Sequence, residues 1–330
     1  MDAIRNMLKG RNVSAAIDFA ADRTRLLVQE GSRTRAVELP GADLATGVRD
    51  SVVDALRQKV AEFRMRDGRC RVSVAASCFR CEMATLPSMT DAELSSSARF
   101  EAMDRFAVEP TDAVIRHLAL GGVRGSGRSV LLLALPMGAA RHAAEAVMAA
   151  GLRMDSLEHA AIAGLRAAST MDAGMATGTV AWLHVEPRVA SLLVQQDGDL
   201  RFMRDFEGEW AVSPRTQTRT RVAVRKDDDS IPLAPEEDQD ESWRWSCLAE
   251  EVLRSLRHAG EGDAWPARLM VAGGTADASL CDALGGVCGV DVTLAACAGW
   301  GTVEGSRDHA WAAAMGTGLD GRAEGARRAA

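Results

Sequence analysis

The 330-residue sequence lacks tyrosine, has only three lysines, and contains few aromatic residues, which make up 4% of the chain. The absence of tyrosine excludes any mechanism that uses a phenol. No stretch approaches the ~20 apolar residues that a membrane-spanning helix needs. The first residues lack the apolar segment of a secretory signal. We therefore expect a protein of the cytoplasm.

Most of the net charge of −7 is local, because Arg225–Glu241 holds two basic and eight acidic residues. The rest of the chain is nearly neutral, so it carries no basic surface of the kind that recruits nucleic acid. The seven cysteines are an odd number in a large chain, which is typical of reduced thiols in a cytosol. The length favours two domains or one large two-lobed domain.

Short alternating segments predict strands, and apolar residues at spacings of three and four predict helices between them. Helices are expected at Leu44–Phe63 and Leu157–Ala168, among others. A capping box, Thr90 followed by Glu93, predicts the start of a further helix. Strands occur in runs and also alternate with helices, so the expected fold class is α/β.

An internal repeat is the most informative feature of the sequence. The segment beginning at Ile17 aligns with the segment beginning at Leu183, so that Leu26–Gln29 (LLVQ) falls on Leu192–Gln195 (LLVQ). Each copy predicts strand, tight turn, strand, turn and strand. Such a duplication is typical of the actin, sugar-kinase and heat-shock ATPase architecture, a ribonuclease H-like two-lobed fold.

Five segments in order resemble the PilM family of type IV pilus assembly proteins. They are a first strand carrying Asp18, the Leu86–Met89 (LPSM) segment with the helix after it, a strand and helix ending in AAGL, a Gly273–Gly274 turn, and a closing helix, AWAAAMGTGL. The resemblance covers almost the whole chain. It implies an actin-like fold with an extra small subdomain in the first half.

The resemblance also implies a domain organisation. The expected parts are the first part of the lobe 1 core (1–70), an inserted small subdomain (71–135), the rest of lobe 1 (136–170), lobe 2 (171–320) with a polar and acidic insertion (213–241), and a loose tail (321–330).

In this fold each lobe supplies a glycine-containing turn whose amides hold phosphates, beside a carboxylate that holds magnesium-bound water. The first turn keeps Asp18, but Ala20 stands where the family has glycine. Asp22 adds negative charge where phosphates would lie, and Arg23 is the residue expected to offset it.

The second turn is also altered, because His184 replaces an aspartate and Pro187 removes an amide donor. Only the adenosine-side turn, with Gly273, Gly274 and Thr275, matches the family pattern. We therefore expect a degenerate nucleotide cleft with no ATP hydrolysis and no required cofactor, although residual ATP and magnesium binding stays open.

By resemblance, the partner is an inner-membrane pilus or secretion protein with a short cytoplasmic N-terminal tail, like PilN. The tail is expected between lobe 1 and the small subdomain, in the region of Leu86, Pro87, Leu94 and Phe106. The chain would then reach the inner membrane only through that partner. Two alternatives stay open: a working ATPase or kinase of the same fold, and the cytoplasmic module of a type II secretion platform, as in GspL.

No metal site is expected from the sequence. Cys78 and Cys81 have zinc-like spacing, but no second pair accompanies them. The six histidines are scattered, without an HExxH pair.

Overall fold

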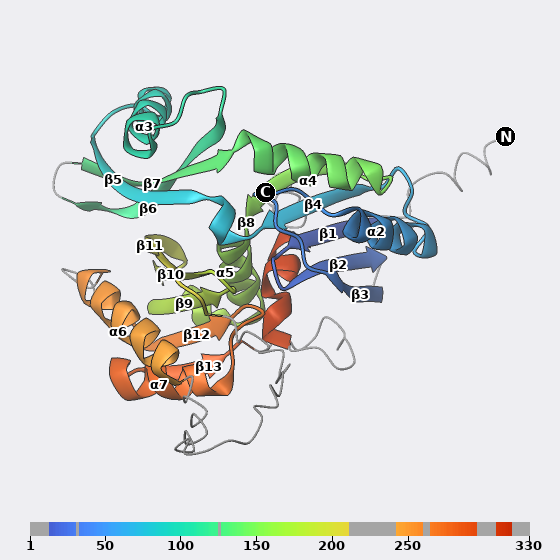
Figure 1. Cartoon of the computed structure of the whole chain (residues 1–330). Helices are drawn as coiled ribbons and strands as arrows, with labels where there is room; N and C mark the ends of the chain where they lie inside the picture. Colours follow the sequence, from blue (N-terminus) through green and yellow to red (C-terminus); the bar gives the residue numbers. More distant parts are fainter. Residues whose placement is uncertain are drawn as a thin grey trace, which may run out of the picture.

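The computed structural model describes residues 13–30, 33–124, 127–210, 242–259, 265–295 and 308–318. These residues form two five-stranded sheets and one three-stranded sheet, with helices packed on their faces (Figure 1). The expected insertion 213–241 and the tail 321–330 lie outside the described residues.

The first sheet has the order β3-β2-β1-β4-β8. The strands are β1 (Val13–Phe19), β2 (Arg23–Glu30), β3 (Arg33–Pro40), β4 (Arg69–Val74) and β8 (Arg153–His159). The first three pair antiparallel, whereas β4 and β8 run parallel to β1. Helices α2 (Asp50–Glu62) and α4 (Met137–Ala149) bury one face of this sheet.

The second sheet repeats this plan with the order β11-β10-β9-β12-β13. The strands are β9 (Thr179–Val185), β10 (Val189–Gln196), β11 (Asp199–Glu207), β12 (Arg268–Ala272) and β13 (Asp291–Leu294). Helices α6 (Ser242–Ala259) and α7 (Ala278–Cys288) cover its outer face. The two sheets confirm the internal repeat and the two-lobed α/β fold.

The small subdomain is a third sheet, of order β5-β7-β6, with one helix on its face. Its elements are β5 (Arg80–Pro87), α3 (Asp91–Phe106), β6 (Ala113–Arg124) and β7 (Gly127–Pro136). The predicted capping box is present, with Glu93 N–H donating to Thr90 Oγ1 and Thr90 N–H donating to Glu93. The subdomain sheet begins at β5, later than residue 71, because β4 belongs to the first sheet.

The two lobes share a central layer of small residues. Helix α5 (Ala160–Met171) and the segment 308–318, which starts with the 3₁₀ turn η3 (Asp308–Trp311), lie between the two large sheets (Figure 1). A Cβ added at Gly316 would lie 1.6 Å from the carbonyl oxygen of Ala163, and one at Gly164 would lie 2.8 Å from Trp182 Cζ2. This layer therefore requires glycine at both contacts.

Two expected helices differ from the structure. The segment Leu157–Ala168 is the end of strand β8 followed by helix α5, rather than one helix. The helix expected from Leu44 begins only at Asp50, after a turn closed by an isolated bridge between Asp43 and Gly47.

Shorter elements are the 3₁₀ turns η1 (Ala76–Cys78) and η2 (Ala173–Ala176). Among the described residues, no helix has the length and apolar character to cross a membrane.

Candidate functional site

The structure brings the three predicted turns of the cleft together. The β1–β2 turn carries Asp22, and the turn after β12 carries Gly273 and Gly274. A Cβ added at Gly274 would lie 1.9 Å from Asp22 Oδ2, and one at Gly273 would lie 2.1 Å from the carbonyl oxygen of Val185. The turns of the two lobes are therefore in direct contact.

Arg25 fills the centre of this contact. It lies on β2 directly opposite Asp18 in the hairpin register, and its side chain is 3% exposed. Its guanidinium lies 2.5 Å from Asp22 Oδ2, 3.3 Å from Glu38 Oε1 and 3.5 Å from Asp18 Oδ2. A Cβ at Gly274 would also lie 2.7 Å from Arg25 Nη2. Three carboxylates thus converge on one buried cation.

Arg25 is the residue that the sequence reasoning missed. Arg23, which was expected to offset the charge of Asp22, is exposed. Arg25 pairs with Asp22 instead. The signal was available in the hairpin: a tight turn between β1 and β2 pairs Asp18 with Arg25, and both side chains point to the same face of the sheet.

Asp18 is buried between a hydrogen-bond donor and a cation. Ser73 Oγ donates to Asp18 Oδ1 at 2.8 Å, and Arg25 lies beside Oδ2. Burial raises the pKa of Asp18 to about 6, against the lowering effects of Arg25 and the Ser73 hydrogen bond. Desolvation thus outweighs the attraction of its partners.

The second turn also reaches across to the first lobe. His184 is buried, and its Nε2 lies 3.4 Å from Glu186 Oε1. Glu186 Oε2 accepts a hydrogen bond from the backbone N–H of Ala76 at 2.9 Å, which belongs to the first lobe. Arg188 in the same turn lies 3.6 Å from Asp43 Oδ2. Glu186 is therefore a lobe-bridging residue that the sequence reasoning also missed.

The adenosine-side turn is held by backbone contacts. Gly273 has φ +103°, a conformation that favours glycine, and its N–H donates to the carbonyl of His309. Thr275 N–H donates to the carbonyl of Val185 at 3.3 Å. This turn retains the glycines that the family pattern requires.

The arrangement of the cleft does not fit an Mg–ATP group. The Asp22 carboxylate and the Arg25 guanidinium lie against Gly274, and Ala20 is buried in its turn. Pro187 offers no amide proton to a phosphate.

A second feature is a groove of about 400 Å³ between helix α3, strand β6 and the start of α4. Strand β6 is an edge strand of the subdomain sheet. The lining residues are Ser95, Arg99, Pro110, Ala113, Val114, Ile115, Arg116, His117 and Met137.

The residues expected to line a partner groove lie elsewhere. Leu86, Leu94 and Phe106 are buried in the core between α3 and the subdomain sheet, so their side chains cannot contact a partner on the surface. Pro87 is exposed at the end of β5 and does not line the groove. Helix α3 lines the groove with Ser95 and Arg99, whereas its apolar face packs inward.

Replacing Arg25 tests the charge cluster of the cleft. We expect Arg25→Ala to lower the free energy of unfolding by about 3–5 kcal/mol, because it leaves the buried carboxylate of Asp18 without a cation. Urea denaturation measures the loss. The double variant Asp18→Asn/Arg25→Met should recover at least half of it, and the exposed Arg23→Ala should change stability by less than about 0.5 kcal/mol. A loss below about 1 kcal/mol for Arg25→Ala would contradict the role assigned to it.

The raised pKa of Asp18 predicts a pH dependence of stability. Because the folded-state pKa is about 6 and the ordinary value is 3.8, the charged carboxylate destabilises the fold at pH 7, and this penalty disappears as the pH falls from about 6 towards 4. Asp18→Asn should therefore be more stable relative to the wild type at pH 7 than at pH 4, by up to roughly 3 kcal/mol. Urea denaturation of both proteins across this range measures the difference, and a difference independent of pH would refute the prediction.

Comparison with known proteins supports the fold. No protein-family model and no curated protein matches the sequence. The chain is similar to a solved PilM–PilN type IV pilus biogenesis complex, with a TM-score of 0.70 at 17% sequence identity, over 94% of this chain and 99% of that chain.

It is also similar to a protein of unknown function with an actin-like ATPase fold from Bacteroides thetaiotaomicron, with a TM-score of 0.50 at 11% identity, over 87% of this chain and 92% of that chain. The cytoplasmic domain of EpsL, an inner-membrane component of the type II secretion system of Vibrio cholerae, aligns with a TM-score of 0.47 at 10% identity, over 86% of each chain. The chain therefore has the two-lobed actin-like fold that its sequence predicts.

Proposed function

We propose that the chain is an actin-like scaffold of an inner-membrane pilus or secretion assembly. It binds the cytoplasmic tail of a membrane partner and lies at the inner face of the membrane through that partner. The observation that carries the proposal is the groove beside edge strand β6, in a fold similar to that of a PilM–PilN complex.

The groove suits an extended peptide. Strand β6 has 12 residues and is paired on one side only, by β7. A peptide that adds to such an edge gains main-chain hydrogen bonds, and side-chain pockets give it specificity. Val114 and Met137 supply apolar contacts, and Arg99 and Arg116 supply basic groups.

The cleft supports a scaffold that works without nucleotide hydrolysis. Asp22 and Arg25 lie against Gly274 of the second lobe, and Glu186 of the second lobe accepts a hydrogen bond from Ala76 N–H of the first. In our proposal the lobes are held together by these protein groups, and no cofactor is required. The rival function, a nucleotide-driven ATPase or kinase, needs these contacts to open for each ATP.

Blocking the groove tests the proposed partner site. The probe is a synthetic peptide with the N-terminal cytoplasmic tail of a single-span membrane protein encoded beside this chain. Isothermal titration calorimetry should detect one bound peptide. Ser95→Arg, which places a large side chain at the groove from exposed Ser95, should weaken binding at least about ten-fold, which is ~1.4 kcal/mol.

Ser96→Arg is the matched control, because Ser96 is an exposed neighbour in the same helix that does not line the groove. Equal affinities for the two variants would place the tail elsewhere on the molecule. No binding of any tail from the neighbouring genes would count against the scaffold itself.

Thermal unfolding with nucleotide separates the scaffold from its rival. A ligand that binds only the folded state at 100 times its Kd stabilises it by about 2.7 kcal/mol. We expect no shift in the unfolding temperature with millimolar Mg–ATP, because Ala20 and Pro187 alter the two phosphate turns and Asp22 adds negative charge to the first. A magnesium-dependent rise would favour a nucleotide-controlled switch, and the chain would then need an ATPase assay.

A further inference from the structure

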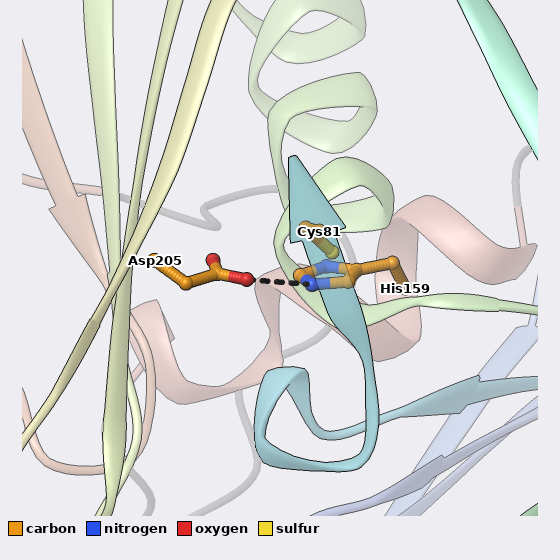
Figure 2. A group of neighbouring side chains, drawn as sticks. All are labelled: Cys81, His159 and Asp205. Atoms are coloured by element: carbon orange, nitrogen blue, oxygen red, sulfur yellow. Dashed lines mark ion pairs between the residues drawn. The ribbon is translucent and has the colours of Figure 1, made fainter. Parts of the chain in front are cut away.

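Three potential metal ligands from separate parts of the chain meet beneath the subdomain sheet. They are Cys81 on β5, His159 at the end of β8, and Asp205 on β11. One ligand atom from each lies within 4.8 Å of the others. Figure 2 shows the three side chains pointing toward one another from the small subdomain, the first lobe and the second lobe.

His159 places an unpartnered nitrogen in this cluster. The residue is 2% exposed, and its Nδ1 accepts a hydrogen bond from Ala161 N–H at 3.2 Å, at the start of α5. Its Nε2 has no hydrogen-bond partner among the described residues, and the nearest charged atom is Asp205 Oδ2 at 4.0 Å. Burial lowers the pKa of His159 to about 3, so the ring is neutral.

Asp205 is a carboxylate without a cation. Ser191 Oγ donates to its Oδ1 at 2.6 Å, and the Cys81 thiol also hydrogen-bonds to it. In the described part of the chain its one ion-pair neighbour is His159, which is neutral. Burial raises the pKa of Asp205 to about 6, and Glu186 and Glu207 add to the rise. This half-buried carboxylate, 17% exposed, therefore has no Lys or Arg beside it among the described residues.

The cluster has a route to solvent. Cys81 and Asp205 line a groove of about 480 Å³ between β5 and β11, whose far wall includes Phe202 and His258. An ion held by the three side chains would lie at the floor of this groove, with His159 beneath it. A fourth coordination position would face the groove and could hold water.

We propose that Cys81, His159 and Asp205 form a zinc site that joins the small subdomain to both lobes. Sulfur, imidazole nitrogen and carboxylate oxygen are the ligands that zinc takes in proteins, and three protein ligands with one open position is a common arrangement. Thiolate, carboxylate and Zn²⁺ together have no net charge, so the ion would neutralise the half-buried carboxylate of Asp205.

Binding of zinc requires two proton movements. The Cys81 thiol gives its proton to solvent and binds as thiolate. The His159 ring stays neutral, and its proton moves from Nε2 to Nδ1 so that Nε2 can bind the metal. This move ends the hydrogen bond from Ala161 N–H to Nδ1, which lowers the affinity but leaves the site neutral. Metal binding should therefore release about one proton at about pH 7.5.

The test uses the full chain, stripped of metal with EDTA and then titrated with Zn²⁺ against a chromophoric chelator. We expect one equivalent to bind, with release of about one proton per zinc in weakly buffered solution. Co²⁺ should bind in its place and show a thiolate charge-transfer band. Nitrogen NMR of the His159 ring should show its proton moving to Nδ1.

Two variants and one control make the test specific. Cys81→Ser and Asp205→Asn should weaken zinc binding by more than about 100-fold, since even outer-shell changes cost ten- to 100-fold. Cys247→Ser, at an exposed cysteine on α6, should bind as the wild type does. Thermal unfolding without metal checks that Cys81→Ser folds. No stoichiometric zinc in the wild type, or wild-type affinity in both site variants, overturns the proposal.

Discussion

The buried guanidinium of Arg25 is the interaction on which the conformation of the β1–β2 turn depends, and this turn meets the second lobe at Gly274. It pairs with Asp18 and Asp22 within the first lobe, and it lies against Gly274 of the second. In a buried setting such a group is stable only while its carboxylate partners stay in place. The β1–β2 turn that carries Asp22 is therefore held in position where it meets Gly274.

Much of the fold could be predicted because the sequence contains the same three-stranded pattern twice. The aligned LLVQ segments predicted two equivalent three-stranded units, and the Thr90–Glu93 capping box located the start of α3. Strand β8 was missed because Arg153–His159 is a partly exposed edge strand with weak alternation, followed at once by an alanine-rich helix. Local periodicity cannot separate such a strand from the helix after it.

The site was harder to predict than the fold. The glycines and altered turns could be read from spacing, but the role of Arg25 depends on the register of one hairpin and on the approach of the other lobe. The Cys81, His159 and Asp205 cluster depends entirely on tertiary structure, because its members come from three separate elements. The expected groove residues were wrong because Leu86, Leu94 and Phe106 are apolar residues that the subdomain buries in its own core.

The last described helix has a consequence for biosynthesis. Gly318 lies near Ala16 and Leu27, so a segment close to the end of the chain covers the sheet that is made first. A nascent chain on the ribosome therefore carries an unfinished first lobe, with part of its apolar sheet uncovered, until residue 318 has left the exit tunnel. Exposed apolar surface of this kind favours aggregation and binding by chaperones. The first lobe can therefore finish folding only after residue 318 has left the exit tunnel.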